Sequence, residues 1–406
     1  MNKITSLVLF LLALSSCTST SKLPAYNKEL LTLINKNLDD AASQYAYLST
    51  TLPPDKLPRS FDHGKLITSD SKWWCSGFYP GTLLYLYENN QNAALYNEAI
   101  LKLNLLKGEQ YNTTTHDLGF MMYCSYGNAN RLQPNAVYKQ ILINGAKSLS
   151  TRFNSATGTI RSWDSKNKNE FLVIIDNMMN LELLFYATKV TGDSSYYKIA
   201  VTHADNTIKN HFRPDNSSYH VVNYNASDGS VLDKRTAQGA ADGSAWARGQ
   251  AWGFYGYTVM YRETRNPKYL EQATKIADFI LNHPNLPGDK IPYWDFNAAG
   301  IPNALRDASA AAILASGLLE FSTYLKREQS KKYLSVAEKI IRTLSDQTYK
   351  STAGENGGFL LKHSVGSIPH KSEVDVALSY ADYYFVEAMV RYKRLASGEG
   401  WYGIRN

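Results

Sequence analysis

The chain has 406 residues, 44% of them hydrophobic, and a formal net charge of +7. A chain this long and apolar can bury a large core, which excludes an intrinsically disordered protein. Its lysines and arginines form no block, so the positive charge suits an anionic ligand and does not indicate a protein that binds nucleic acid.

The first residues predict an export signal. Residues 1–16 contain one early lysine, an apolar run from Leu7 to Leu14, and small residues that lead to Cys17. The apolar run is too short to span a bilayer. Its LSSC ending resembles the bacterial lipobox, in which the cysteine carries the lipid; an ordinary cleaved signal is the alternative. We therefore expect a lipoprotein signal peptide over residues 1–16, lipidation of Cys17, and a tether over residues 17–24. The protein would then be lipid-anchored in the bacterial cell envelope, facing the periplasm or the cell surface, with no other membrane contact.

Helical segments of two kinds alternate over residues 25–406. Amphipathic segments place apolar residues three and four positions apart, as at Leu270, Ala273, Ala277 and Ile280. Between them lie segments that are apolar on nearly every face, which is typical of helices buried on all sides. These segments read GFYPGTLLYLYE, HDLGFMMYCSYGNA, DNMMNLELLFYA, SAWARGQAWGFYGYTVMYRE, DASAAAILASGLLEF and DVALSYADYYFVEAMVRY. Six inner helices that alternate with outer helices predict an all-α fold, an (α/α)6 toroid, as a single domain without a separate β domain. An open superhelix of repeats is the alternative.

An aspartate stands at or just before the predicted start of five inner helices. These residues are Asp117, Asp176, Asp242, Asp307 and Asp375. Each is expected to cap its helix by accepting backbone N–H bonds. Because the inner helices of a toroid are parallel, Asp117 and Asp176, from consecutive helices, should lie close together at one end of the ring. Asp176 follows five apolar residues, where a carboxylate is costly unless it is paired, hydrogen-bonded or protonated.

Other sequence features bear on metals, cofactors and disulfides. The spacing of His, Asp and Glu suggests no metal site, and there is no glycine-rich phosphate loop, so we expect neither a metal nor a cofactor. Cys75 and Cys124 each lie in an apolar aromatic segment. Buried free thiols are therefore favoured over a disulfide between them.

Several motifs resemble the unsaturated glucuronyl hydrolases of glycoside hydrolase family 88. They are WARGQAW from Trp246 to Trp252, the His116–Asp117 pair in THDLGF, and GFYPG from Gly77 to Gly81, with Tyr79 where the family has Trp. YHVV at Tyr219, DASAAAI at Asp307 and DYYFVEAMVR at Asp382 extend the resemblance over nearly the whole chain. The resemblance implies a catalytic (α/α)6 domain. It also implies a reaction in which water is added to the C4=C5 double bond of a uronic acid that a polysaccharide lyase has made, so that the unsaturated sugar is released from its oligosaccharide.

The resemblance also assigns roles to residues. It implies that Asp176 is the general acid/base and Asp117 a second essential carboxylate. Substrate-binding positions implied by the resemblance are His116, Trp74, Trp163, His220, Gln238, Arg248 and Trp252. Ser364, Ser367 and Lys371, in the segment from Lys362 to Lys371, are implied contacts of a sulfated second sugar, with a plain solvated loop as the alternative. The implied substrates are unsaturated uronic-acid oligosaccharides, above all glycosaminoglycan disaccharides.

Other functions remain open at this stage. An (α/α)6 glycosidase that cuts intact polysaccharide would also use two carboxylates. The related hydrolases of unsaturated rhamnogalacturonides share the toroid but have Asn at the position of Gln250. A non-catalytic glycan-binding lipoprotein would keep the tryptophans, yet it should tolerate the loss of Asp117 and Asp176.

Overall fold

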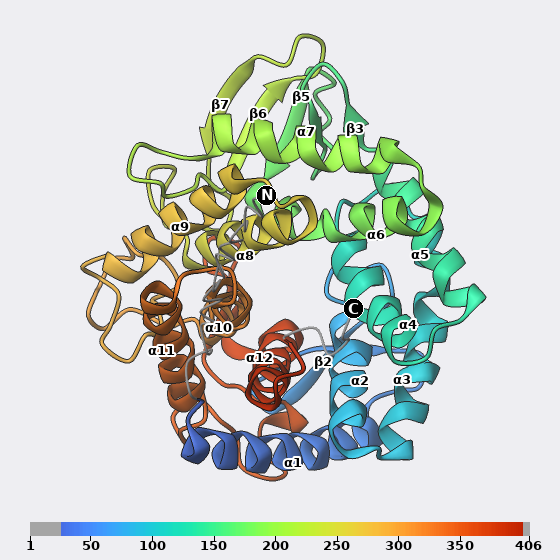
Figure 1. Ribbon diagram of the computed structural model, residues 1–406, viewed down its shortest axis with the longest axis vertical. Coiled ribbons are helices and arrows are strands. Elements are labelled where there is room, and N and C mark those ends of the chain that lie inside the picture. The colour runs from blue at the N-terminus through green and yellow to red at the C-terminus, as the bar shows by residue number, and fades with distance from the viewer. Residues whose placement is uncertain (1–25, 401–406) are drawn as a thin grey trace, which may run out of the picture.

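The computed structural model describes residues 26–400 and shows a closed ring of helices (Figure 1). The inner ring consists of α2 (Phe78–Asn90), η2 (Gly119–Gly127) with α4 (Asn128–Leu132), η3 (Ile175–Asn180) with α6 (Glu182–Thr191), α8 (Ala247–Thr264), α10 (Ala308–Ser322) and α12 (Ser379–Ser397). The outer ring consists of α1 (Lys28–Thr51), α3 (Ala93–Leu106), α5 (Ala136–Ser150), α7 (Ser194–His211), α9 (Pro267–Asn282) and α11 (Arg327–Leu344). The predicted signal peptide, Cys17 and the tether lie outside the described residues.

Burial separates the two rings as the apolar patterns predict. Every residue of α10 is buried, whereas α9 buries a stripe and begins with Asn266 as its N-cap and a proline in its first turn. Helix α12 packs against α10 on one side and α2 on the other, and α1 lies over that seam. The first and last hairpins therefore touch, which confirms the (α/α)6 toroid over an open superhelix.

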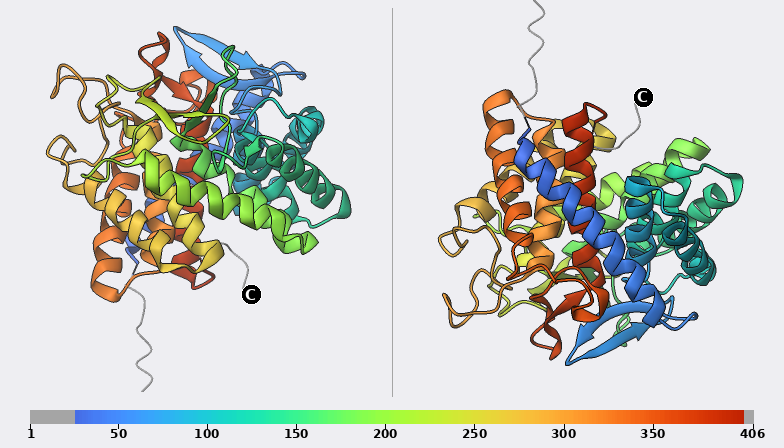
Figure 2. Two further views of the ribbon diagram at one scale, coloured as in Figure 1. Left: turned by 90° about the horizontal axis from the view of Figure 1, so that it is seen from above. Right: turned by 90° about the horizontal axis from the view of Figure 1, so that it is seen from below.

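Short strands lie in the segments that lead into inner helices, and they gather at one end of the ring (Figure 2). One antiparallel sheet has the order β2 (Lys65–Ser69), β1 (Leu57–Asp62), β9 (Ser372–Leu378), β8 (Ser364–Ser367). A second has the order β5 (Glu170–Ile174), β6 (Val221–Asn225), β7 (Val231–Arg235), and β3 (Phe153–Asn154) pairs with β4 (Thr159–Ile160). These sheets are formed by the segments that connect the helices. The segment from Lys362 to Lys371, which was predicted to be a loop, contains β8.

Glycines bring three inner elements into close contact. A Cβ atom on Gly119 would lie 2.4 Å from Cα of Asn180, and the Asn180 side chain accepts the backbone N–H of Phe120 at 2.9 Å. A Cβ atom on Gly256 of α8 would lie 2.4 Å from Cβ of Met178. Neither contact leaves room for a methyl group. The start of η2, the residues Met178 and Asn180 of η3, and the middle of α8 are thereby held in one arrangement.

The helix-cap prediction is right for only one of the five aspartates. Asp307 is the N-cap of α10 and accepts the backbone N–H of Ser309 at 3.0 Å. Asp117 comes just before Leu118, the N-cap of η2, and Asp176 is the second residue of η3. Asp242 lies in a loop ahead of Trp246, the N-cap of α8. Asp375 lies in β9. The connecting segments form strands and turns of unequal length, so a regular spacing along the chain does not put an aspartate at each first helical turn.

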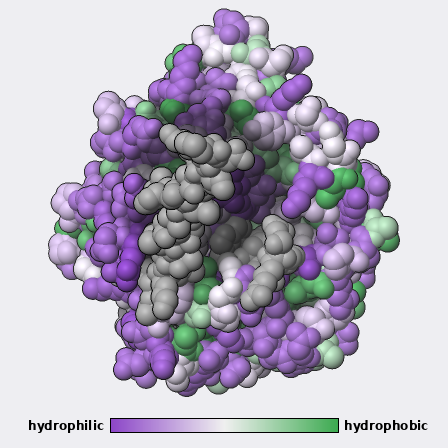
Figure 3. Space-filling view, in the orientation of Figure 1, coloured by the Kyte–Doolittle hydropathy of each residue, from purple (hydrophilic) through white to green (hydrophobic). Residues whose placement is uncertain are grey.

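The thiols of Cys75 and Cys124 are free, as predicted. Burial raises the pKa of both thiols. Within residues 26–400, no helix has the length and apolar character needed to cross a membrane. The face at the end of the ring away from the strands is mostly hydrophilic and hollowed at its centre (Figure 3).

Candidate active site

A cleft of about 390 Å³ opens at the strand-bearing end of the ring. Its lining comes from the segments ahead of the inner helices and from the strands. The lining residues are Arg59, Lys72, Trp73, Trp74, Thr115, His116, Asp117, Trp163, Ile174, Asp176, Gln238, Arg248, Gly366, Ser367, His370, Ser372, Glu373 and Tyr380. Acidic, basic and aromatic side chains thus share a space whose volume is typical of small-molecule sites.

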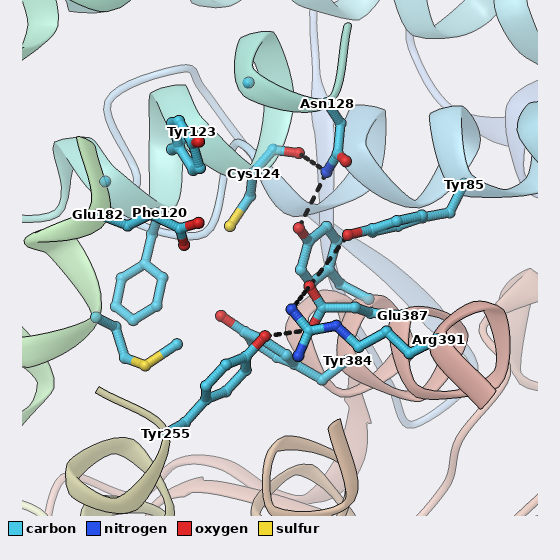
Figure 4. A pocket seen from close by; sticks show the side chains of 14 residues that line it. Tyr85, Phe120, Tyr123, Cys124, Asn128, Glu182, Tyr255, Tyr384, Glu387 and Arg391 are labelled. Carbon is cyan, nitrogen blue, oxygen red and sulfur yellow. Dashed lines mark hydrogen bonds and ion pairs between the residues drawn. The ribbon is translucent and has the colours of Figure 1, made fainter. Parts of the chain in front are cut away.

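A second, enclosed cavity lies inside the ring between η2, α8 and α12 (Figure 4). Its volume is about 40 Å³, and Arg391 and Glu387, which form an ion pair at 3.3 Å, are part of its lining. The hydroxyl of Tyr255 donates to Glu387 at 3.0 Å. The space suits buried water but not a sugar ring. The cleft at the strand end holds the predicted Asp117, Asp176 and Arg248, and for that reason it is the candidate active site.

Asp176 is a buried carboxyl group at the wall of this cleft. It follows β5 directly, because that strand ends at Ile174 and η3 begins at Ile175. Burial raises the pKa of Asp176 from 3.8 to about 7; the charge of Arg248 opposes this rise, and the charge of Asp117 adds to it. Oδ2 of Asp176 has no hydrogen-bond partner within residues 26–400. A carboxyl group of this kind can hold a proton near neutral pH and transfer it.

A histidine lies beside each of the two acidic groups. Nε2 of His116 lies 3.3 Å from Oδ1 of Asp117, and Nδ1 of the same ring lies 3.0 Å from the carbonyl oxygen of Ser162. Nε2 of His220 lies 3.8 Å from Oδ2 of Asp176. Thr115 donates its hydroxyl hydrogen to Oδ2 of Asp117 at 3.0 Å, which orients that carboxylate. Asp117 and Asp176 therefore each have an imidazole neighbour of their own.

Arg248 supplies a buried positive charge and joins several segments. Its guanidinium donates to the carbonyl oxygens of Val365 and Gly366 in β8, and to Oε1 of Gln238 at 3.4 Å. It also lies 4.4 Å from the centre of the Trp246 ring. Only 2% of the Arg248 side chain is exposed, so this charge acts in a poorly solvated place. Arg248 can therefore attract the carboxylate of a ligand in the cleft.

Aromatic side chains line two sides of the cleft. The Trp74 ring lies 4.9 Å from that of Tyr380, and the Trp163 ring stands edge-on to His220 at 5.7 Å. The guanidinium of Arg59 lies 4.1 Å from the centre of the Trp73 ring. Flat apolar faces beside fixed hydrogen-bonding groups suit the binding of sugar rings. Within residues 26–400, no three His, Cys, Asp or Glu side chains converge as metal ligands would.

Comparison with known proteins identifies the family. The model of Glycosyl Hydrolase Family 88 matches residues 55–399. The chain belongs to glycosyl hydrolase family 88. It is 48% identical to the unsaturated glucuronyl hydrolase of Formosa agariphila, over 80% of this chain and 81% of that protein. It is 31% identical to the unsaturated chondroitin disaccharide hydrolase of Streptococcus pneumoniae, over 82% and 85% of the two chains. A solved unsaturated glucuronyl hydrolase specific for heparin is 46% identical, with a TM-score of 0.87 over 90% of this chain and 98% of that one.

Membership of family 88 confirms the predicted family and enzyme class. The chain is a glycoside hydrolase. Many of the residues implied by the sequence resemblance meet in the cleft: Asp176, Asp117, His116, Trp74, Trp163, Gln238, Arg248 and Ser367. His220 lies just behind them, buried against Asp176.

Three of the implied substrate contacts do not reach the cleft of this family 88 enzyme. Trp252 is 0% exposed and packs against Phe120 with ring centroids 5.0 Å apart. It stands one helical turn beyond Arg248 in α8 and therefore lies beneath the cleft floor. Ser364 is fully buried in β8, and Lys371 lies exposed in the turn that joins β8 to β9.

Other cleft residues escaped the sequence analysis. Arg59, Lys72, His370, Glu373 and Tyr380 line the cleft, and Arg59 pairs with Glu373 at 2.5 Å. Arg59, His370 and Glu373 come from two hairpins that are far apart in the chain and meet through the pairing of Ser60 with Leu378, while Lys72 follows the first hairpin and Tyr380 lies in the first turn of α12. No local sequence pattern marks that pairing. Of these residues, only His370 had a signal in the sequence, because it lies in the segment from Lys362 to Lys371 that was predicted to contact the second sugar.

Proposed function

We propose that this protein releases the unsaturated uronic acid from lyase-generated glycosaminoglycan disaccharides by adding water to the C4=C5 double bond. The observation that carries the proposal is Asp176, a buried carboxyl with a pKa of about 7 in a cleft that also holds Arg248. The heparin-specific relative and the unsaturated chondroitin disaccharide hydrolase support glycosaminoglycan disaccharides as the substrate class. Protonation of an enol ether at carbon needs such an acid, held against one atom.

The proposed reaction uses Asp176 twice. Asp176 gives its proton to C4, and positive charge develops at C5 and the ring oxygen. Water then adds to C5 and returns a proton to the Asp176 carboxylate, which restores the acid. The C5 hemiketal opens, and C1 expels the second sugar. No bond to the protein is formed, so the task of the chain is to orient the substrate and to place the proton.

The surrounding residues support the binding of the uronic acid. Arg248 is a positive group for the substrate carboxylate, and Trp74 and Trp163 offer ring faces. The carboxylate of Asp117 adds negative charge near C5, where positive charge develops, and this stabilises the transition state. Gln238, held by Arg248 at 3.4 Å, is available to a sugar hydroxyl. The proposed recognition thus combines one charge pair, two aromatic contacts and polar groups in fixed positions.

A panel of disaccharides tests the substrate assignment. Unsaturated disaccharides from heparin, chondroitin and hyaluronan, each made with a lyase, should lose their enol-ether absorbance when the enzyme is added. Intact polysaccharide should yield no reducing ends. Cleavage of intact polysaccharide would favour an ordinary (α/α)6 glycosidase, and activity confined to unsaturated rhamnogalacturonides would identify a different substrate. No turnover of any substrate, combined with tight glycan binding, would favour a binding lipoprotein.

The segment around β8 and β9 is proposed to contact the second sugar. Ser367 lines the cleft, whereas Lys371 lies at its outside. Lys371 would reach a sulfate only on a sugar that projects from the cleft. If Lys371→Ala leaves the ratio of kcat/KM for sulfated over unsulfated disaccharides unchanged while Ser367→Ala changes it, Ser367 alone forms this subsite.

We also propose that Cys17 anchors the enzyme in the bacterial envelope. The LSSC sequence supports this proposal. Cells fed a radiolabelled fatty acid should incorporate label into the wild-type protein and not into Cys17→Ala. Equal labelling of the two proteins would rule out the anchor.

A further inference from the structure

The ring hydrogen of His220 has a fixed position. Nδ1 of His220 accepts two backbone N–H groups, from Ala237 at 3.1 Å and from Gln238 at 3.2 Å. A backbone N–H can only donate, so Nδ1 must present its lone pair. The hydrogen of the neutral ring therefore resides on Nε2.

The nitrogen that carries this hydrogen lies beside the candidate acid. Nε2 of His220 lies 3.8 Å from Oδ2 of Asp176, which is longer than a hydrogen bond, and neither atom has a hydrogen-bond partner among the described residues. Both residues are buried, at 3% and 9% exposure. A carboxyl oxygen that faces an N–H acts as an acceptor, so the acidic hydrogen of Asp176 belongs on the other oxygen, Oδ1.

His116 has the opposite arrangement. Its Nδ1 faces the carbonyl oxygen of Ser162 at 3.0 Å, and a carbonyl can only accept, so Nδ1 carries the hydrogen. Its Nε2 then presents a lone pair toward Asp117. His116 and His220 therefore have different chemical characters, although both belong to the same set of predicted substrate contacts.

We propose that His220 is a positioning residue that stays neutral with its hydrogen on Nε2, and that it directs the transferable proton of Asp176 to Oδ1. The proposal rests on the proposed function of Asp176 as the acid. When Oδ1 gives its proton to C4, the carboxylate left behind gains a hydrogen bond from Nε2–H. When water adds to C5, its proton returns to Oδ1, and His220 itself neither gains nor loses a proton.

The surroundings of His220 keep it neutral. Protonation at Nδ1 would break both backbone hydrogen bonds. Burial and the charge of Arg248 on α8 hold the pKa of His220 well below its usual range. Further titratable groups act on it from other elements: His211 of α7, His370 of the β8–β9 turn, and His116. The rings of Trp246 and Trp163 lie at 4.5 and 5.7 Å.

The tautomer can be measured without any assay of activity. ¹⁵N spectra of histidine-labelled protein distinguish protonated from unprotonated ring nitrogens, and the spectrum of His220→Asn assigns the signals of His220 by their loss. We expect Nε2 protonated and Nδ1 unprotonated from about pH 5 to 8, the range in which a free histidine titrates. His203, whose Nδ1 accepts the N–H of Ile160 at 3.1 Å, serves as the reference for this tautomer. A hydrogen on Nδ1, or titration of His220 in this range, would overturn the proposal.

Two substitutions of His220 test the roles of Nδ1 and Nε2 separately. His220→Asn places an amide oxygen near Nδ1 and keeps the anchor for Ala237 and Gln238, but it removes the Nε2 donor. We expect kcat to fall about 10- to 100-fold, as for the loss of a hydrogen bond to a charged group. The basic limb of the kcat profile should move to higher pH, because the ionised form of Asp176 loses a donor. The melting temperature should change little.

His220→Gln is the matched variant. It keeps an N–H donor near Nε2 and loses the acceptor at Nδ1, so it should retain more of kcat than His220→Asn while melting at a lower temperature. If His220→Asn has the kcat of the wild type and the basic limb of its pH profile does not move, the positioning role of His220 is contradicted. Failure of the proposed function looks different: Asp176→Asn would then keep its turnover whatever the tautomer of His220.

Discussion

The guanidinium of Arg248 lies 3.5 Å from the carboxylate of Asp307, and both side chains are buried. Asp307 also caps α10 and accepts the backbone N–H of Val365 at 3.3 Å, so one carboxylate joins α8, α10 and β8. The positive charge of the cleft is therefore held in place by a residue that lies outside the cleft lining.

Removal of this carboxylate should destabilise the fold. Asp307→Ala leaves Arg248 with a buried charge that lacks its acidic partner, which typically costs about 3 to 5 kcal/mol. Urea unfolding at neutral pH measures the loss. Asp242→Ala is the control, because Asp242 is exposed and its carboxylate accepts the backbone N–H of Thr236, while its bond to Arg213 uses the backbone carbonyl that alanine keeps; this change should cost less than about 1 kcal/mol. Equal stability of Asp307→Ala and wild type would contradict the role given to this pair.

Substitution of Arg248 should change the pH profile. The charge of Arg248 lowers the pKa of Asp176, so Arg248→Gln should raise that pKa and move the basic limb of kcat to higher pH. Arg248→Lys keeps the charge and should leave the limb near its wild-type position, while KM rises because the bonds to Val365 and Gly366 are lost. Measurement of kcat and KM across pH for both variants decides the matter, and an identical limb in all three proteins would rule out this coupling.

The close contact between η2 and η3 should be intolerant of a methyl group. Gly119→Ala would place a Cβ atom 2.4 Å from Cα of Asn180. We expect a loss of about 1 to 3 kcal/mol, as for other overpacked cores, together with a lower kcat because the segments that bear Asp117 and Asp176 are displaced. Gly108→Ala is the control, because no atom lies within 4 Å of its added Cβ. Thermal melts and turnover of the two variants provide the comparison.

Asp176 should make the fold less stable as the pH rises. Its pKa is raised from 3.8 to about 7 in the folded state, so the folded protein binds the proton more tightly than the unfolded chain does. That contribution is fully present below pH 3.8 and is lost as the pH rises through about 7. Asp176→Asn should therefore gain stability relative to wild type at pH 8, by up to about 4 kcal/mol, and much less at pH 5. Stability differences that do not vary between these pH values would argue against a buried, proton-holding carboxyl.

The ring of helices was predictable because its signal is local. All-apolar and amphipathic segments alternate along the chain, and each pattern can be read within a few helical turns, as in α10 and α9. The strands carry a weaker signal: β8 is four residues long and buried throughout, with no alternation to mark it. The helix-cap prediction was wrong at four of the five aspartates because the turns ahead of the inner helices vary in length.

The cleft was only partly predictable. His116, Asp117 and Arg248 stand in recognisable motifs, Asp176 stands at the start of a predicted inner helix, and the fold brings the four residues together. Trp252 shares the motif of Arg248 but lies one turn deeper, and depth along a helix cannot be judged from a motif alone. Arg59 and Glu373 come from hairpins more than 300 residues apart, so their pairing depends on the closure of the ring.

Turnover by Asp176→Asn tests the central claim most directly. Asn is nearly isosteric with Asp but has no acidic proton to give. With a lyase-generated disaccharide, kcat should fall by about 10² to 10⁴, as for the loss of a general acid/base, while KM changes little and the far-UV circular dichroism spectrum stays that of the wild type. A well-folded Asp176→Asn enzyme with near-wild-type kcat would contradict the account.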